Sequence, residues 1–126
     1  TIKHLLNHSS GLYNYTASKK LKWEDTPNQC LENSLKRKLN FTPGSKYDYC
    51  NTGYVILGLI IEKITAQSYQ QNITERIFKP CGLESMIYCS DDKIPFNTAR
   101  GYKIKHNKYT DFTEIDHSWA KSACAI

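Results

Sequence analysis

The chain has 126 residues, 40% of them hydrophobic and 23% charged, which fits one globular domain with its own core and excludes a disordered segment. Its formal net charge is +5, but the one basic run, residues 36–38, has no aromatic stripe or nucleic-acid motif beside it. A solvated helix face explains this run, and no nucleic-acid partner is expected. The longest apolar run, residues 54–61, is far shorter than the roughly 20 residues that cross a bilayer.

The first half of the chain predicts two helices separated by a loop. Residues 1–6 fit a helix with Thr1 as its N-cap, which residues 9–11 end. Residues 13–28 are polar and irregular, with Pro27 as a breaker, and predict a loop. An amphipathic helix is expected over residues 29–39, because apolar side chains recur there at helical spacing: Cys30, Leu31, Leu35 and Leu39.

The second half predicts two further helices and a hairpin. Residues 52–65 are apolar nearly all round and predict a helix buried on most sides. Gly58 in its middle costs about 1 kcal/mol relative to alanine, which indicates a close backbone contact there. Ser68 is expected to cap a helix that ends near Phe78, and the looser pattern of residues 100–112 predicts a short hairpin. The side chains expected to point inward in this last helix are Tyr69, Ile73, Ile77 and Phe78.

The cysteines and histidines show no metal pattern. Five cysteines at irregular spacing include no C-x-x-C pair, and His4, His106 and His117 have no metal-ligand spacing with carboxylates, so no metal or cofactor is expected. A disulfide between Cys81 and Cys89 is an option in an oxidising compartment, but buried free thiols are favoured. No signal peptide opens the chain, and both of its ends look cut, since it starts inside a helix and stops without a closing signal.

The segment from Phe41 to Tyr54 carries the most chemistry. A Pro-Gly turn leads into Tyr49-Cys50-Asn51, and an apolar helix follows at once. In an extended backbone Tyr49 and Asn51 point to one side, while Cys50 points away and is expected to be a small buried residue. A phenol has a pKa of about 10 that nearby lysine charges can lower, so a phenol beside a carboxamide suits proton transfer next to a nucleophile. The structural alternative makes Tyr49 a core-edge tyrosine and Asn51 an N-cap.

Four blocks of the sequence, in the same order, resemble one family. Leu5-Leu6-Asn7-His8-Ser9-Ser10-Gly11-Leu12 is similar to the L-L-x-H-x-S-G-L segment of the serine β-lactamase and DD-peptidase superfamily, with the closest likeness to class C β-lactamases and their esterase and penicillin-binding-protein relatives. Residues 41–54 resemble that family's F-x-P-G…Y-S-N-x-G-Y block, residues 57–63 its L-G-x-I-I-E-K helix and residues 77–83 its I-F-x-P-L-G-M segment. Together the matches span residues 1–88.

The resemblance implies a fold. In the family an α+β domain contains a sheet flanked by helices and a helical subdomain. Residues 1–126 are expected to form a single partial domain, mainly helical, with the remainder of the parent domain as a partner. Departures from the family pattern are Cys50 for the usual serine, Cys81 for an apolar residue, Met86 for a common threonine, and Cys124 and Ala125 for the glycines of S-A-G-G-[LI].

The resemblance also implies a reaction and site residues. A serine in an S-x-x-K helix attacks an amide or ester carbonyl, and water later cleaves the acyl-enzyme. The implied roles are a general base or acid for Tyr49 and a ligand of substrate or lysine for Asn51. Tyr15 falls near residues that line the substrate pocket and is a candidate contact, with an exposed loop tyrosine as the alternative. His8 lies in a loop of the family, where a turn-stabilising role is favoured over a catalytic one.

The nucleophile of this scheme does not stand where the family has it. In the family S-x-x-K precedes the first block, ahead of Thr1, and the third motif lies beyond Ile126. Two formal matches, Ser90–Lys93 and Ser118–Lys121, follow Tyr-x-Asn and are attributed to chance. We therefore expect a portion of a serine hydrolase that acts on a β-lactam, a peptidoglycan peptide or a small ester and is inactive by itself.

The alternative function is a non-catalytic helical binding or scaffold module derived from the same family. The substrate expected of the parent is a small molecule or a peptidoglycan-type peptide. The family favours an extracytoplasmic or membrane-associated parent, but the residues themselves leave the compartment open.

Overall fold

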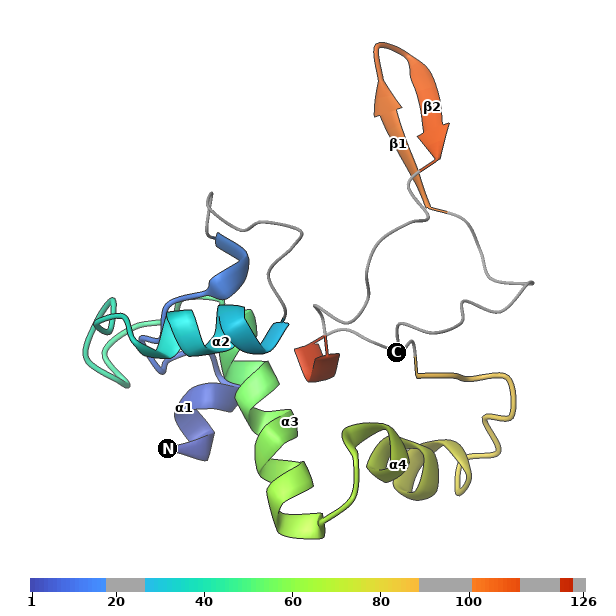
Figure 1. Ribbon diagram of the computed structural model, residues 1–126, viewed down its shortest axis with the longest axis horizontal. Coiled ribbons are helices and arrows are strands. Elements are labelled where there is room, and N and C mark those ends of the chain that lie inside the picture. The colour runs from blue at the N-terminus through green and yellow to red at the C-terminus, as the bar shows by residue number, and fades with distance from the viewer. Residues whose placement is uncertain (18–26, 89–100, 112–120, 124–126) are drawn as a thin grey trace.

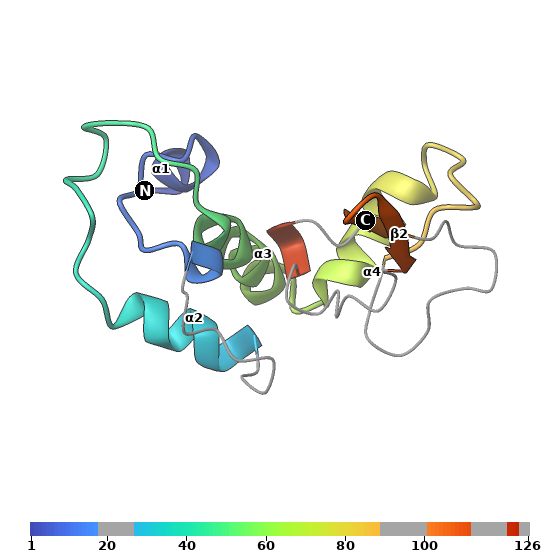
Figure 2. The ribbon, with the colours of Figure 1, turned by 90° about the horizontal axis from the view of Figure 1, so that it is seen from above.

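One central helix organises the part of the chain that the structure describes. The computed structural model describes residues 1–17, 27–88, 101–111 and 121–123. The longest helix, α3 (Asn51–Thr65), lies between two groups of shorter elements (Figures 1 and 2). The other helical elements are α1 (Ile2–Leu6), the 3₁₀ turn η1 (Tyr15–Ala17), α2 (Pro27–Leu35), α4 (Tyr69–Ile73), the π-helical turn η2 (Thr74–Phe78) and the 3₁₀ turn η4 (Lys121–Ala123).

The core lies where the first third of the chain meets α3. Tyr15, Leu31 and Val55 are buried and contact one another, and Ile56 and Ala123 pack against them from the side. Elements α1, η1, α4 and η4 all contact α3, and α2 contacts η1. The helix α3 therefore connects segments that lie far apart in the sequence.

The first helix is confirmed and the second is shifted. The Thr1 hydroxyl accepts the His4 N–H at 3.3 Å, so Thr1 is the N-cap of α1 as predicted. Helix α2 begins at Pro27, two residues before the predicted start, and ends at Leu35, so the prediction of Pro27 as a breaker is wrong. In the first turn of a helix proline loses no hydrogen bond, and its fixed φ suits the helix. On the predicted apolar face Leu31 is buried, whereas Leu35 and Leu39 are about half exposed.

Helix α3 has the predicted length but is less covered than predicted. It ends at Thr65, where Ala66 takes the left-handed conformation with φ 54°. Its buried residues are Thr52, Gly53, Val55 and Gly58. The prediction of burial on most sides is wrong for the second half, because the elements that contact α3 leave exposed three of its large apolar side chains: Leu59, Ile61 and Ile64.

The next helix begins as predicted and changes its winding halfway. The Ser68 hydroxyl accepts the Gln71 N–H at 3.1 Å, and the Gln71 side chain accepts the Ser68 N–H at 3.0 Å, which completes a capping box. From Thr74 the chain continues as the π-helical turn η2. Its wider turn buries Phe78, five residues after the buried Ile73, and leaves Ile77 45% exposed, so the predicted inward position of Ile77 is wrong.

The predicted hairpin is confirmed. Strands β1 (Tyr102–Lys105) and β2 (Lys108–Asp111) pair antiparallel, with Ile104 opposite Tyr109. The two connecting residues, His106 and Asn107, both have positive φ, as the favoured two-residue hairpin turn requires. The hairpin projects away from the helices (Figure 1).

The thiols differ in burial. Cys50 is a free, buried cysteine as expected, but Cys81 is free and exposed, so the expectation of burial is wrong for Cys81. Cys89, the alternative disulfide partner, lies outside the described residues, as do the match Ser90–Lys93 and the serine of the match Ser118–Lys121, whereas Lys121 is the first residue of η4. No helix in the described ranges is both long and apolar enough to cross a membrane.

Candidate active site

The loop after α1 and the segment before α3 form one structural unit. Residues 8–11 accept backbone hydrogen bonds from residues 40–48, and the pairs, donor first, are Asn40 with Gly11, Gly44 with Ser9 and Asp48 with His8, each at 2.8 Å. The first two blocks of the family resemblance therefore lie side by side, although about 30 residues separate them in the sequence.

Two glycines allow this close approach. Gly11 has φ +74°, and a Cβ on it would overlap the carbonyl oxygen of Phe41. Gly44 has φ +87°, and a Cβ on it would lie 3.2 Å from Nε2 of His4. Glycine adopts positive φ more readily than residues with a side chain, so both positions favour glycine for conformation, and Gly11 also requires it for space.

The Tyr49-Cys50-Asn51 segment shows alternating exposure. Cys50 is 3% exposed, and its thiol donates to the Leu12 carbonyl at 3.4 Å. Tyr49 is 53% exposed and Asn51 is partly buried. This alternation is what the extended backbone predicts, and it leaves the Tyr49 phenol open to solvent beside the start of α3.

Asn51 bonds to another segment and does not cap the helix. Cys50 occupies the N-cap position of α3, and Asn51 is the first helical residue, so the alternative of Asn51 as an N-cap is wrong. The Asn51 amide nitrogen donates to the Thr16 hydroxyl at 3.1 Å, and that hydroxyl donates to the Asn14 side chain at 2.9 Å. The turn η1 thus holds the carboxamide in place. Sequence reasoning missed Thr16, because a contact between residues 35 positions apart leaves no local pattern.

Tyr15 is a core residue in this structure. It is 4% exposed, and its N–H donates to the Thr52 hydroxyl at 3.0 Å. The Thr52 hydroxyl donates in turn to the Tyr13 carbonyl at 2.8 Å. The alternative of an exposed loop tyrosine is therefore wrong. The predicted contact of Tyr15 with substrate stays a prediction.

His8 lies among three tyrosine rings at the site. Its ring centroid is 4.5 Å from that of Tyr49, 4.9 Å from that of Tyr54 and 5.8 Å from that of Tyr47. Its Nδ1 accepts the Cys50 N–H at 3.2 Å. The charge of Lys46, which the sequence places near Tyr49, lies over the Phe41 ring, 4.8 Å from its centroid.

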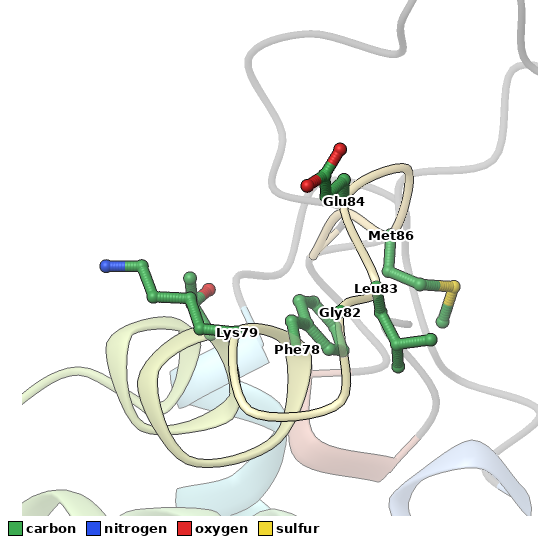
Figure 3. Close-up of a pocket in the computed structure, with 7 residues that line it drawn as sticks. Phe78, Lys79, Gly82, Leu83, Glu84 and Met86 are labelled. Atoms are coloured by element: carbon green, nitrogen blue, oxygen red, sulfur yellow. The ribbon is translucent and has the colours of Figure 1, made fainter.

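Two hollows elsewhere on the surface contain none of the predicted site residues. One of about 290 Å³ lies beside η2 and the segment that follows it. Phe78, Lys79, Leu83 and Met86 are among the residues that line it, and the amine end of Lys79 points away from the others (Figure 3). The other, of about 160 Å³, lies between α3 and α4 beside Tyr69, and burial raises the pKa of the Tyr69 phenol. Within the described ranges no three His, Cys, Asp or Glu side chains come together as a metal site.

Comparisons with known proteins point to one family. The family model described as Beta-lactamase matches residues 1–126. Penicillin-binding protein 4* of Bacillus subtilis (strain 168) is 37% identical over 95 residues, which cover 70% of this chain and 21% of the relative. A D-aminopeptidase of Brucella anthropi is 34% identical over 109 residues, which cover 82% of this chain and 21% of the relative.

A solved structure shares the fold. The D-amino acid amidase from Ochrobactrum anthropi SV3, in complex with L-phenylalanine amide, superposes with a TM-score of 0.81 at 30% identity, over 97% of this chain and 37% of the amidase. The matched part of the chain covers only about a fifth of the length of the penicillin-binding protein and of the D-aminopeptidase.

Proposed function

Because this chain belongs to the β-lactamase family, we propose that it supplies the Tyr-x-Asn element of a serine hydrolase that works through an acyl-enzyme. The substrate classes are a β-lactam, a peptidoglycan peptide and a small ester. The names of the penicillin-binding protein, the D-aminopeptidase and the D-amino acid amidase favour a substrate with an amide carbonyl. The observation that carries the proposal is the pairing of an exposed Tyr49 with an anchored Asn51 beside the family's first loop.

In this proposal Tyr49 accepts the proton of the attacking serine hydroxyl. As a serine oxygen bonds to the carbonyl carbon, its proton passes to the Tyr49 oxygen while the phenol proton passes to a lysine amine, and that proton is then given to the nitrogen or oxygen whose bond to the carbonyl carbon breaks. Water afterwards adds to the acyl-enzyme and releases the acid. The exposure of Tyr49 supports this role, since a proton-transfer group must reach its substrate.

Asn51 orients the substrate or the lysine. Its amide nitrogen already bonds to the Thr16 hydroxyl, so the carboxamide plane is fixed before a substrate arrives. A preformed polar group loses little conformational freedom on binding, which favours precise placement of the carbonyl.

The catalytic serine and lysine are proposed to lie outside residues 1–126. Both formal S-x-x-K matches follow Tyr-x-Asn in sequence, which is the reverse of the family order. Loss of one member of a cooperating catalytic set costs several orders of magnitude in rate, so the chain by itself is proposed to be inactive.

The first experiment incubates the 126-residue chain with a fluorescent penicillin and follows the label by gel and intact mass. We expect no stoichiometric label, because the proposal places the nucleophile outside residues 1–126. A chain that takes up one label per molecule would contradict the assignment of the serine to another segment.

The second arm uses the genomic sequence on both sides. An S-x-x-K motif upstream supports the enzyme, and its absence favours the binding module.

In the longer protein Tyr49→Phe is expected to lower the acylation rate constant about 10²- to 10⁴-fold. The matched control is Tyr47→Phe, an exposed tyrosine two residues earlier in the same segment, which is expected to leave the rate nearly unchanged. Equal rates for the two variants would exclude Tyr49 as the proton-transfer group.

A further inference from the structure

One residue holds the backbone on both sides of Tyr49. The His8 carbonyl accepts the Asp48 N–H at 2.8 Å, and the His8 Nδ1 accepts the Cys50 N–H at 3.2 Å. In an extended segment the amides of residues two apart point the same way, so one neighbour can bind both. Tyr49 therefore lies between two hydrogen-bonded residues, Asp48 and Cys50, and His8 is the acceptor for both, through its carbonyl and its imidazole.

The imidazole is fixed by its packing. Its ring lies 4.9 Å from the Tyr54 ring at an interplanar angle of 26°, and the Tyr54 hydroxyl donates to the Leu6 carbonyl at 2.9 Å. The imidazole also contacts the Tyr49 ring, which is tilted by 41° with its centroid at 4.5 Å. Stacked aromatic rings at these distances attract each other, and the Leu6 hydrogen bond stops the Tyr54 ring from turning away.

The backbone of His8 has an uncommon conformation that serves both bonds. Its φ is +55°, in the left-handed region that His, Asn and Asp enter more readily than other residues with a side chain. In this conformation its carbonyl and its imidazole both reach residues 48–50. Nδ1 can accept this hydrogen bond only in the tautomer whose proton is on Nε2.

From this geometry we propose that His8 is a positioning residue, which sets the place and direction of the Tyr49 phenol for proton transfer. The inference rests on the proposed function of Tyr49. His8 itself touches no reacting atom. It acts through two backbone hydrogen bonds and one ring contact, and the proposal goes beyond the turn-stabilising role that the sequence favours.

Two substitutions at His8 separate the contribution of its hydrogen-bond acceptor from that of its ring. His8→Asn keeps a residue that tolerates positive φ and places a side-chain oxygen near the position of Nδ1, but removes the ring. His8→Gly tolerates the same φ and keeps the carbonyl for Asp48, but removes both the acceptor and the ring. The pair therefore tests the acceptor without adding backbone strain.

The direct readout is amide hydrogen exchange of the 126-residue chain, followed by NMR. In His8→Gly the Cys50 amide is expected to exchange about tenfold faster, as loss of one hydrogen bond predicts, with the Asp48 amide and the α3 amides unchanged. In His8→Asn the Cys50 amide is expected to keep most of its protection. Unchanged Cys50 exchange in His8→Gly, with α3 still protected, would overturn the proposal.

A titration of the unmodified chain covers the case in which His8→Gly does not fold. A second proton on the imidazole occupies Nδ1 and removes the acceptor, so the Cys50 amide should lose protection together with the change in the His8 ring signals. The rings that face His8 are the phenols Tyr47, Tyr49 and Tyr54, and the Asp48 backbone N–H donates to the His8 carbonyl. If the protection of the Cys50 amide does not change where the His8 ring signals change, the proposal is also overturned.

The link to catalysis is tested in the longer protein that contains an S-x-x-K serine. His8→Gly is expected to lower kcat about 10- to 100-fold with little change in KM, because a misplaced phenol affects the chemical step more than binding. His8→Asn is expected to recover most of the loss. If Tyr49→Phe lowers the rate and His8→Gly does not, the positioning role fails. If Tyr49→Phe has no effect, the proposed function fails, and amide exchange alone decides whether His8 holds the segment.

Discussion

At the scale of single residues, Thr52 connects two segments of the candidate site, the start of α3 and residues 13–15. It is fully buried, and its hydroxyl donates to the Tyr13 carbonyl while it accepts the Tyr15 N–H. A single hydroxyl thereby serves two backbone groups of the loop that also carries Thr16, the partner of Asn51. The position of the carboxamide thus depends on a residue that is itself out of reach of substrate.

The change Thr52→Val tests this dependence. Valine keeps the shape but removes the hydroxyl, so the Tyr13 carbonyl and the Tyr15 amide lose this partner, at a cost of about 1–3 kcal/mol for each group. We expect the free energy of unfolding, measured with urea, to fall by at least the cost of one such group, about 1–3 kcal/mol. The control Thr52→Ser keeps the hydroxyl and loses one methyl group, at about 1 kcal/mol. A Val variant no less stable than the Ser variant would show that the two hydrogen bonds contribute little.

At the scale of elements, α3 and η4 meet at Gly58. The Ser122 hydroxyl donates to the Tyr54 carbonyl at 2.7 Å, and the Ser122 side chain fills the space in which a Cβ of Gly58 would lie. This is the close contact that a glycine in the middle of an apolar helix predicts. The contact ties residues near the end of the chain to the helix that follows the Tyr-x-Asn segment.

A double-mutant cycle measures this contact. A Cβ on Gly58 would lie 2.5 Å from the Ser122 Cβ, so Gly58→Ala is expected to destabilise the chain by about 1–3 kcal/mol through overpacking. In a Ser122→Gly background the same change removes the clash and keeps the gain in helix propensity of about 1 kcal/mol, so its effect should become neutral or stabilising. Urea unfolding of the four proteins gives the coupling energy. If Gly58→Ala has the same effect in both backgrounds, Ser122 does not pack against Gly58 in solution.

Sequence patterns predicted these elements to different degrees, and the reason is physical. Local signals found the capping residue Ser68, the length of α3 and the hairpin, because caps, apolar runs and turn residues act over a few positions. The π-helical winding after Thr74 has no simple residue signature, so the exposure of Ile77 was missed. At the site, alternation predicted the burial of Cys50, but the bonds from His8 to residues 48 and 50 span 40 positions and leave no local pattern.

At the scale of the whole molecule, exposed large apolar side chains outnumber buried ones among the residues that the structure describes. The buried hydrophobic residues among those described are six in number, and many large apolar side chains remain exposed. On α3 these are Leu59, Ile61 and the 76% exposed Ile64, and after η2 they are Leu83, Met86 and Ile87. In the family fold we expect such faces to pack against the rest of the domain, because exposed apolar patches of this kind mark interaction surfaces.

This surface predicts that the 126-residue chain associates with itself as its concentration rises. Burial of an isoleucine side chain contributes about 1.5–3 kcal/mol, so a few of these residues in a shared contact suffice for binding in the micromolar range. Sedimentation velocity should therefore show a sedimentation coefficient that rises with concentration, and Ile64→Lys should reduce the rise. The matched control is Ile104→Lys on the hairpin, the same substitution at a residue that is 69% exposed. If both changes act equally, the α3 face is not the contact, and a chain that stays monomeric throughout contradicts the prediction.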